Sequence, residues 1–131
     1  MVYNLTGGWL GEPADPQIVE QVVFEIKINL PKDYLDFIFI HNGGEGFVGE
    51  NYLIIWKIEE LLEFNREYEV GKYAPGILLF GSSGGGEGYG YDTNLAEMPI
   101  IRIPFIGMNR KYMEIVAQDF ASLFTRSGAL R

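Results

Sequence analysis

The order in which helical and extended patterns follow one another constrains this chain's fold more than any other sequence feature. Apolar residues recur at helical spacing over residues 16–41, over 57–69 and near the C-terminus. Between them lie short apolar runs separated by turn residues, and the connections are too short for crossover helices, which favours antiparallel pairing. The sequence therefore predicts a single α+β domain with N-terminal helices, a central mostly antiparallel sheet and a C-terminal helix.

The start of the domain is predicted from capping residues. Residues 1–14 contain three glycines and a proline, so we expect an irregular lead-in, followed by a domain over 15–131. Asp15 and Pro16 are typical of a helix start, because aspartate caps the first amides and proline fits the first turn. Pro31 should begin a second helix, apolar on most sides, that ends at residues 41–44 (HNGG).

The remaining elements follow from apolar runs. We expect strands at 47–48, 52–56, 77–80, 89–91, 99–103 and 112–116. A helix should span Lys57–Glu69, and a closing helix should begin at Asp119 and end at Ser127-Gly128. The residues predicted to be buried are Phe37, Ile38, Leu79, Phe80, Ile101 and Phe120.

Composition is typical of one globular domain. Of the 131 residues, 47% are hydrophobic and 21% are charged, which is too apolar for disorder. The chain has no cysteine, which excludes disulfides and thiolate chemistry and indicates a reducing compartment. The first residues lack a basic start followed by an apolar run, and no stretch reaches membrane length. We therefore expect cytoplasmic localisation and no membrane partner.

The charge is acidic and unevenly distributed. The formal net charge is −8, which argues against nucleic acid as a partner, since duplex binding requires neutralisation of phosphates by basic residues. Residues 33–70 hold nine acids against Lys57 and Arg66. This local acidity is typical of a solvated surface, and it would also suit a basic protein partner.

A glycine cluster over residues 81–90 suggests a phosphate-binding loop, but the pattern does not fit. Gly86 is followed by Glu87 instead of the Lys-Ser/Thr of a phosphate loop. We interpret the cluster as a structural glycine connection between two strands. Exposed loop amides that receive a partner's carboxylate or carbonyl remain the alternative. The glycines assigned to this connection are Gly84, Gly85, Gly86 and Gly88.

No residue pattern predicts catalysis, metal binding or a cofactor. His41 is the one histidine in the chain, and its place at a helix end suits an interaction with the helix dipole better than a general base. The acids near residue 60 have no histidine at ligand spacing. The chain is therefore predicted not to be an enzyme, with no catalytic residues, no metal ligands and no cofactor.

Several segments resemble one known family. They are Leu30–Tyr34 (LPKDY), Asn42–Gly44 (NGG), the acidic helix with Glu59, Glu60 and Asn65, Gly76–Glu87 with Tyr89, Tyr91 and Asp92, Pro104–Met108 and Asp119–Leu123. Together they resemble the SUKH superfamily, and within it the Smi/Knr branch, named for a fungal regulator of cell-wall glucan synthesis. The resemblance runs from about residue 15 to the end. The chain departs from the family pattern at Ser82-Ser83, where an aspartate is expected at or beside position 83.

The resemblance implies a protein-binding function. Bacterial members of this branch are thought to serve largely as immunity proteins against polymorphic toxins, many of them nucleases, so the expected partner is a basic toxin domain. A regulatory adaptor in cell-wall synthesis or signalling and a small-ligand binding domain are the alternatives. The sequence does not define an oligomeric state.

The helix at 57–69 is the candidate partner-binding surface. Its core side is expected to carry Ile58, Leu61, Leu62 and Tyr68. On the opposite side, acids at spacings of four would form a ladder of like charges. This arrangement is typical of a solvated helix face, and it also suits a basic partner that packs on an aromatic anchor. The candidate residues are Glu59, Glu60, Glu63, Phe64 and Glu67.

Overall fold

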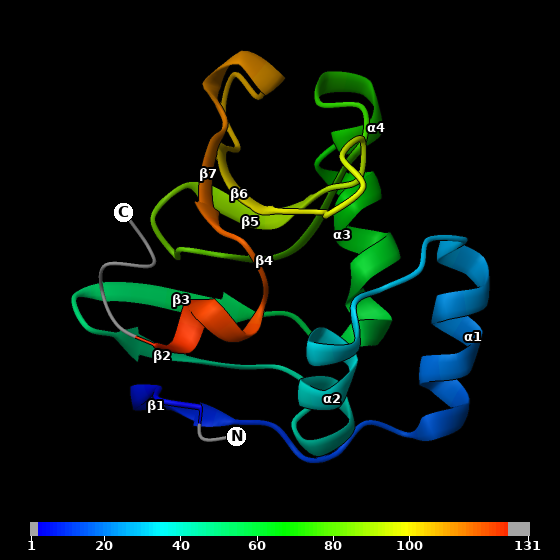
Figure 1. Cartoon of the computed structure of the whole chain (residues 1–131), viewed down its shortest axis with the longest axis vertical. Helices are drawn as coiled ribbons and strands as arrows, with labels where there is room; N and C mark the ends of the chain where they lie inside the picture. The colour runs from blue at the N-terminus through cyan, green and yellow to red at the C-terminus, as the bar shows by residue number, and fades with distance from the viewer. Residues whose placement is uncertain (1–2, 126–131) are drawn as a thin grey trace.

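The computed structural model describes residues 3–125, which form one antiparallel sheet with helices around it (Figure 1). The seven strands pair in chain order, each with its neighbours in sequence. They are β1 (Thr6–Leu10), β2 (Gly44–Val48), β3 (Asn51–Ile55), β4 (Ile77–Ser82), β5 (Glu87–Asp92), β6 (Ile100–Pro104) and β7 (Glu114–Ala117). The predicted α+β class and antiparallel sheet are confirmed.

The helices lie mainly between β1 and β4 in the chain. The α-helices are α1 (Pro16–Ile26), α2 (Lys32–Ile40), α3 (Leu61–Glu67) and α4 (Val70–Tyr73). Three 3-10 turns complete the set: η1 (Ile58–Glu60), η2 (Arg110–Tyr112) and η3 (Ala121–Phe124). No helix in the described part of the chain is long and apolar enough to cross a membrane.

Helix α1 begins where its capping residues predict. The Asp15 carboxylate accepts a hydrogen bond of 2.9 Å from the backbone amide of Gln17, and Pro16 occupies the first turn. The helix ends at Lys27, whose φ of 60° breaks the helical path. The connection to α2 is therefore short, and α2 starts directly after Pro31.

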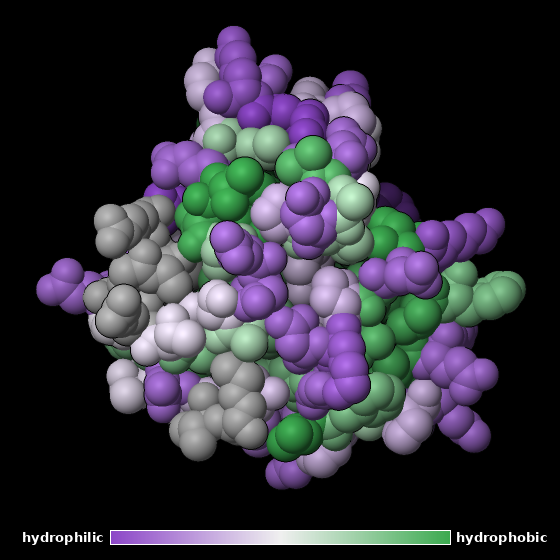
Figure 2. Space-filling model, viewed as in Figure 1, coloured by the Kyte–Doolittle hydropathy of each residue, from purple (hydrophilic) through white to green (hydrophobic). Residues whose placement is uncertain are grey.

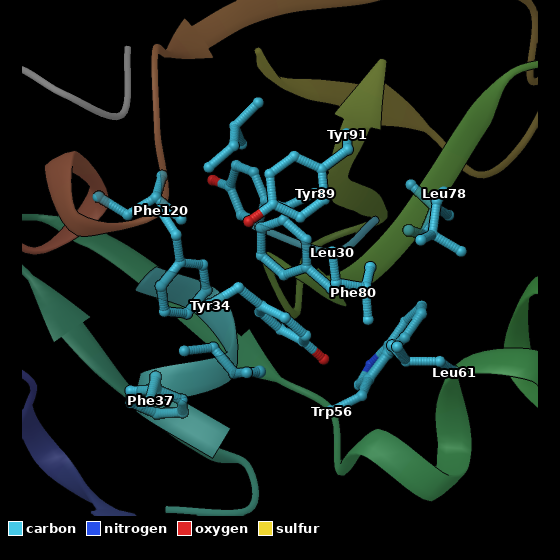
Figure 3. Close-up of a cluster of buried hydrophobic side chains, with 14 of the residues drawn as sticks. Leu30, Tyr34, Phe37, Trp56, Leu61, Leu78, Phe80, Tyr89, Tyr91 and Phe120 are labelled. Carbon is cyan, nitrogen blue, oxygen red and sulfur yellow. The ribbon is translucent and has the colours of Figure 1, made fainter. Parts of the chain in front are cut away.

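Helix α2 supplies the centre of an aromatic core. Tyr34 lies among the rings of Phe80, Tyr91 and Phe120, with ring centroids 5.8, 6.3 and 5.3 Å away (Figure 3). Edge-to-face contacts of this kind add to the free energy gained by burying the rings. The six residues predicted to be buried are at most 1% exposed, which confirms that prediction: Phe37, Ile38, Leu79, Phe80, Ile101 and Phe120.

The outer side of α2 is less buried than its sequence indicates. Phe39 and Ile40 are 44% and 52% exposed, so the helix is buried on one side only. On the face seen in Figure 2, apolar residues (green) lie as separate patches among hydrophilic ones (purple). Isolated exposed apolar residues of this kind are common on protein surfaces.

Strand β1 was not expected. It forms within the segment predicted to be an irregular lead-in and pairs with β2 at the edge of the sheet. Gly8 permits this pairing, because a Cβ atom at that position would lie 1.9 Å from the carbonyl oxygen of Glu45. The pairing also shifts register between Thr6 and Trp9. The glycines that indicate irregular backbone are thus the residues that let this strand approach β2.

The single helix predicted over 57–69 is wrong. The chain forms the 3-10 turn η1, then α3, and leaves the helical path at Glu69, whose φ is 53°. Helix α4 then begins at Val70. Tyr68 was expected on the core side but is 42% exposed, because it lies at the end of α3 where the chain turns.

The closing helix is shorter than predicted. Asp119 accepts a hydrogen bond of 2.9 Å from the backbone amide of Ser122, as a capping residue does, but the turn that follows is the 3-10 turn η3. The expected end at Ser127-Gly128 lies outside the described residues. Asp33 of α2 accepts a bond of 3.0 Å from the amide of Ala121 and so ties this turn to α2.

Asn65 of α3 takes the place of a strand partner for β4. Strands β3 and β4 pair only at Ile54–Ser82 and Ile55–Gly81, which leaves the backbone of Leu79 without a neighbour from β3. The Asn65 side chain accepts a bond of 2.9 Å from the Leu79 amide and donates one of 2.9 Å to its carbonyl oxygen. Helix α3 is thereby held along the edge of β4.

Candidate functional site

Three of the four acids proposed from the sequence as a partner-binding surface are exposed. Glu59 lies in η1, and Glu63 and Glu67 lie in α3, with all three side chains exposed to solvent. Glu63 and Glu67 make no hydrogen bond or ion pair within the part of the chain that the structure describes. Because η1 is a 3-10 turn, the three acids span two helix types and are not one α-helical ladder.

Two of the candidate acids hold local structure. The Glu60 carboxylate accepts a bond of 2.9 Å from the backbone amide of Lys57 and so caps the turn at its start. Glu59 accepts a bond of 2.6 Å from the side chain of Asn42, whose oxygen in turn accepts the amide of Ile58 at 2.8 Å. Asn42, from the NGG motif, therefore fixes both the start of η1 and the position of the Glu59 carboxylate.

Phe64 belongs to a row of stacked and edge-on rings beside the acids. Its ring meets Trp56 edge-on, with centroids 4.9 Å apart. Trp56 is stacked with Tyr68 at 6.2 Å, and Tyr68 is stacked with Phe105 at 4.2 Å. Phe64 is only partly exposed, so it supports the fold as well as bordering the acidic surface.

The glycine cluster forms the hairpin between β4 and β5. Gly84 and Gly86 have φ angles of 77° and 101°, which residues other than glycine rarely adopt. Gly88 lies in β5, where a Cβ atom would stand 3.0 Å from side-chain atoms of Leu79 and Phe105. A strand follows the hairpin instead of a helix, so the geometry of a phosphate loop is not formed.

Ser83, at or beside the position where the resemblance leads us to expect an aspartate, organises this hairpin. Its hydroxyl oxygen accepts bonds from the backbone amides of Gly85 at 3.1 Å and Glu87 at 3.3 Å. The Gly86 carbonyl oxygen accepts the amide of Phe105 at 2.9 Å, which ties the hairpin to the loop after β6. The hydroxyl thus supplies an acceptor for the loop amides, as a carboxylate at this place would.

The ionisable residues outside the acidic surface are arranged for structure. His41 follows the end of α2, and its Nδ1 lies 3.0 Å from the carbonyl oxygen of Gly11. Buried Asp92 pairs with Arg110 at 2.9 Å. Among residues 3–125, no group of three or more histidine and acidic side chains could hold a metal ion.

Fold and site together define a small α+β domain built on a seven-stranded antiparallel meander, with an acidic surface bordered by aromatic rings. A family model described as the SMI1 / KNR4 family (SUKH-1) matches residues 13–126. Because this match covers most of the chain, the protein belongs to the SMI1 / KNR4 family, as the sequence motifs indicate. That family includes toxin immunity proteins.

A bacterial relative shares part of the sequence. The uncharacterized protein YnaB of Bacillus subtilis (strain 168) is 34% identical over 83 residues, which cover 63% of this chain. The aligned segment spans 53% of that relative's own length. The similarity therefore supports the family and says nothing of activity or partners.

One feature of this surface, an aromatic pocket, was not predicted from the sequence. Tyr68, Tyr73 and Phe105 come from α3, α4 and the loop after β6, and they line one pocket together with Gly107 and Met108. These residues are up to 40 positions apart in the chain, so no local pattern indicates that they meet. The sequence signal for an exposed apolar loop is weak. It consists of the apolar residues Phe105 and Ile106 between two turn residues, Pro104 and Gly107.

Proposed function

We propose that this protein is a cytoplasmic immunity protein without enzymatic activity, which binds a cognate polymorphic toxin and blocks it. The partner is a basic toxin domain, with a nuclease as the expected class. Family membership supports this proposal, because the family includes toxin immunity proteins. The observation that carries the proposal is the exposure of Glu59, Glu63 and Glu67 in two consecutive elements, η1 and α3.

The mechanism is occlusion of the toxin's substrate groove. A nuclease needs a basic groove to bind the phosphates of its substrate. The exposed carboxylates carry the opposite charge to that groove, as the phosphates do. Charges of opposite sign also accelerate encounter, so the toxin is captured before it reaches its substrate. Glu63 and Glu67 are the main contributors, because they are exposed and uncommitted to the fold, whereas Glu60 caps η1.

The test starts from capture of the partner. The tagged full chain is used as bait in a lysate of its native host, and a captured protein is then purified and assayed for toxicity. We expect a basic protein, encoded next to this chain's gene, whose activity is abolished at a one-to-one ratio of the two proteins. An acidic partner, or a toxin that stays active in the complex, contradicts the proposal. Capture of a cell-wall synthesis enzyme favours the adaptor function instead.

A further inference from the structure

A pocket with aromatic walls lies at the end of the acidic surface. It has a volume of about 360 Å³ and is lined by Tyr68, Tyr73, Phe105, Gly107 and Met108. This volume falls within the range of ligand sites, roughly 300–1,000 Å³. Three of its five lining residues carry aromatic rings.

The turn between α3 and α4 builds one side of this pocket. Glu69 adopts a φ of 53°, and this break separates Tyr68 at the end of α3 from Tyr73 at the end of α4. The loop after β6 supplies the opposite side and lies beside α3 and α4 in Figure 1 (yellow). In that loop Gly107 has a φ of 71°, and Met108 is 5% exposed. The pocket thus rests on a buried side chain.

The rings of this pocket differ from the core rings in their access to solvent. Tyr68 and Tyr73 are 42% and 46% exposed, whereas Tyr34 and Tyr91 in the core are at most 1% exposed. Tyr68 is also held in place, because it is stacked on Phe105 with the ring planes 17° apart. A ring held in place by Phe105 and Trp56 contacts a ligand without further loss of side-chain freedom.

The electrostatic setting of the pocket favours a cation. Glu67 and Glu69 flank Tyr68 in the chain and are exposed. Lys72 already places its ammonium group 5.1 Å from the Tyr73 ring centroid, with a Glu69 oxygen 3.9 Å away. Lys72 thus contacts one ring of the pocket and offsets the charge of Glu69, so an incoming cation replaces Lys72 at that ring.

We propose that this pocket binds an arginine side chain of the partner protein. A guanidinium group is planar, permanently charged and weakly hydrated, so it stacks on aromatic rings better than an ammonium group does. Glu67, which is exposed and next to Tyr68 in the chain, supplies a carboxylate for its N–H donors. This inference rests on the proposed function in one respect only, that the partner is a basic protein.

The pocket can be tested without the partner. The probe is the tripeptide acetyl-Gly-Arg-Gly-amide, titrated into the full-length ¹⁵N-labelled protein and followed by NMR. The control probe carries citrulline, which has the shape of arginine without its charge. We expect saturable shifts at Gly107, Tyr73 and the indole N–H of Trp56, which is stacked with Tyr68. The citrulline peptide is expected to give at most a small fraction of them.

Variants locate the binding site. Tyr73→Leu and Tyr68→Leu should each lower the affinity for the arginine peptide by about 3- to 30-fold, the range expected for loss of a cation–π contact. The matched control is Tyr112→Leu. Tyr112 is 54% exposed and has Lys111 over its ring at 5.0 Å, yet it does not line the pocket. Equal binding of the citrulline peptide, or loss of binding in all three variants alike, overturns the inference.

A second arm separates this inference from the proposed function. Peptide binding that requires Tyr73 upholds the pocket even when no toxin is captured, and the proposed function alone then fails. With a captured partner, Tyr73→Leu should raise the dissociation constant by a similar factor, about 3- to 30-fold. A toxin whose affinity ignores both Tyr68→Leu and Tyr73→Leu overturns the inference and leaves the acidic surface as the site.

Discussion

Single glycines fix the distance between neighbouring strands in this protein. At Gly90 of β5, a Cβ atom would lie 2.3 Å from the carbonyl oxygen of Leu78 in β4, and at Gly81 it would lie 2.1 Å from that of Ile54 in β3. These atoms belong to paired backbone, which cannot move aside without breaking strand contacts. Both glycines therefore serve close packing, independently of any turn.

The first prediction concerns these glycines. Gly90→Ala should lower the free energy of unfolding by about 2–4 kcal/mol, because backbone atoms must separate to admit a methyl group. Gly84→Ala and Gly86→Ala should cost about 1 kcal/mol each through their positive φ. The matched control is Gly85→Ala, where the nearest atom is 3.7 Å away. Urea unfolding that gives the same loss for Gly85→Ala and Gly90→Ala contradicts this account.

Two core tyrosines carry buried hydroxyl groups. The hydroxyls of Tyr34 and Tyr91 have no hydrogen-bond partner within the described residues. Burial raises the pKa of both phenols above the ordinary value of about 10. The folded protein therefore keeps both protons at a pH where the unfolded chain loses them.

The second prediction is a loss of stability at alkaline pH. Since the unfolded chain binds fewer protons above about pH 10, the free energy of unfolding should fall as the pH rises beyond that value. Tyr34→Phe and Tyr91→Phe remove the ionisable group, so each should flatten this fall and leave neutral-pH stability unchanged or up to about 1 kcal/mol higher. The measurement is chemical unfolding at several pH values. If the double variant loses as much stability above pH 10 as the wild type does, these two tyrosines are not the cause of the alkaline loss.

At the scale of elements, Asn65 links α3 to the sheet by side-chain hydrogen bonds. Its amide group replaces the strand partner that Leu79 lacks, and it also donates a bond of 2.7 Å to the carbonyl oxygen of Leu61. Leu79 is fully buried, so loss of these bonds leaves polar backbone groups without water or partner.

The third prediction follows from this arrangement. Asn65→Ala should lower the free energy of unfolding by about 2–4 kcal/mol, since an amide and a carbonyl are left unsatisfied. Asn65→Asp should not restore it, because a carboxylate faces two carbonyl oxygens. The control is Asn109→Ala, which removes an exposed cap from η2 and should cost about 1 kcal/mol. Equal losses for Asn65→Ala and Asn109→Ala would show that the Asn65 bonds contribute little.

Local signals predict the elements that depend on local physics. The Asp15-Pro16 start, the helix after Pro31 and the apolar run of β4 all follow from capping and periodicity. Strand β1 and the break at Glu69 depend on distant partners. β1 exists because Gly8 meets Glu45 across the sheet, and no local pattern records that contact.

At the scale of the whole molecule, charge is easier to predict than shape. The acidic surface is visible in the sequence because its acids are close together in the chain. Its position beside an aromatic pocket is not visible, since Tyr68 and Phe105 meet only after the sheet has formed. The sequence thus indicates where the acids lie in the chain, and the structure adds the aromatic pocket beside them.

In the proposed function, the acidic surface captures a basic protein partner. The most direct test of this claim is the association rate with the captured partner at low and at high salt, for the wild type and for the combined variant Glu59→Lys, Glu63→Lys and Glu67→Lys. The matched control reverses three exposed acids elsewhere, Glu20→Lys, Glu25→Lys and Glu97→Lys, and so changes the net charge equally.

We expect the wild-type association rate to fall by about tenfold or more as salt is raised, because salt screens charges beyond about 8–10 Å. The surface variant should associate slowly at low salt and respond little to added salt, and the control variant should stay much closer to the wild type. Circular dichroism should show that both variants are folded. A wild-type rate that ignores salt, or equal slowing by both variants, contradicts the claim.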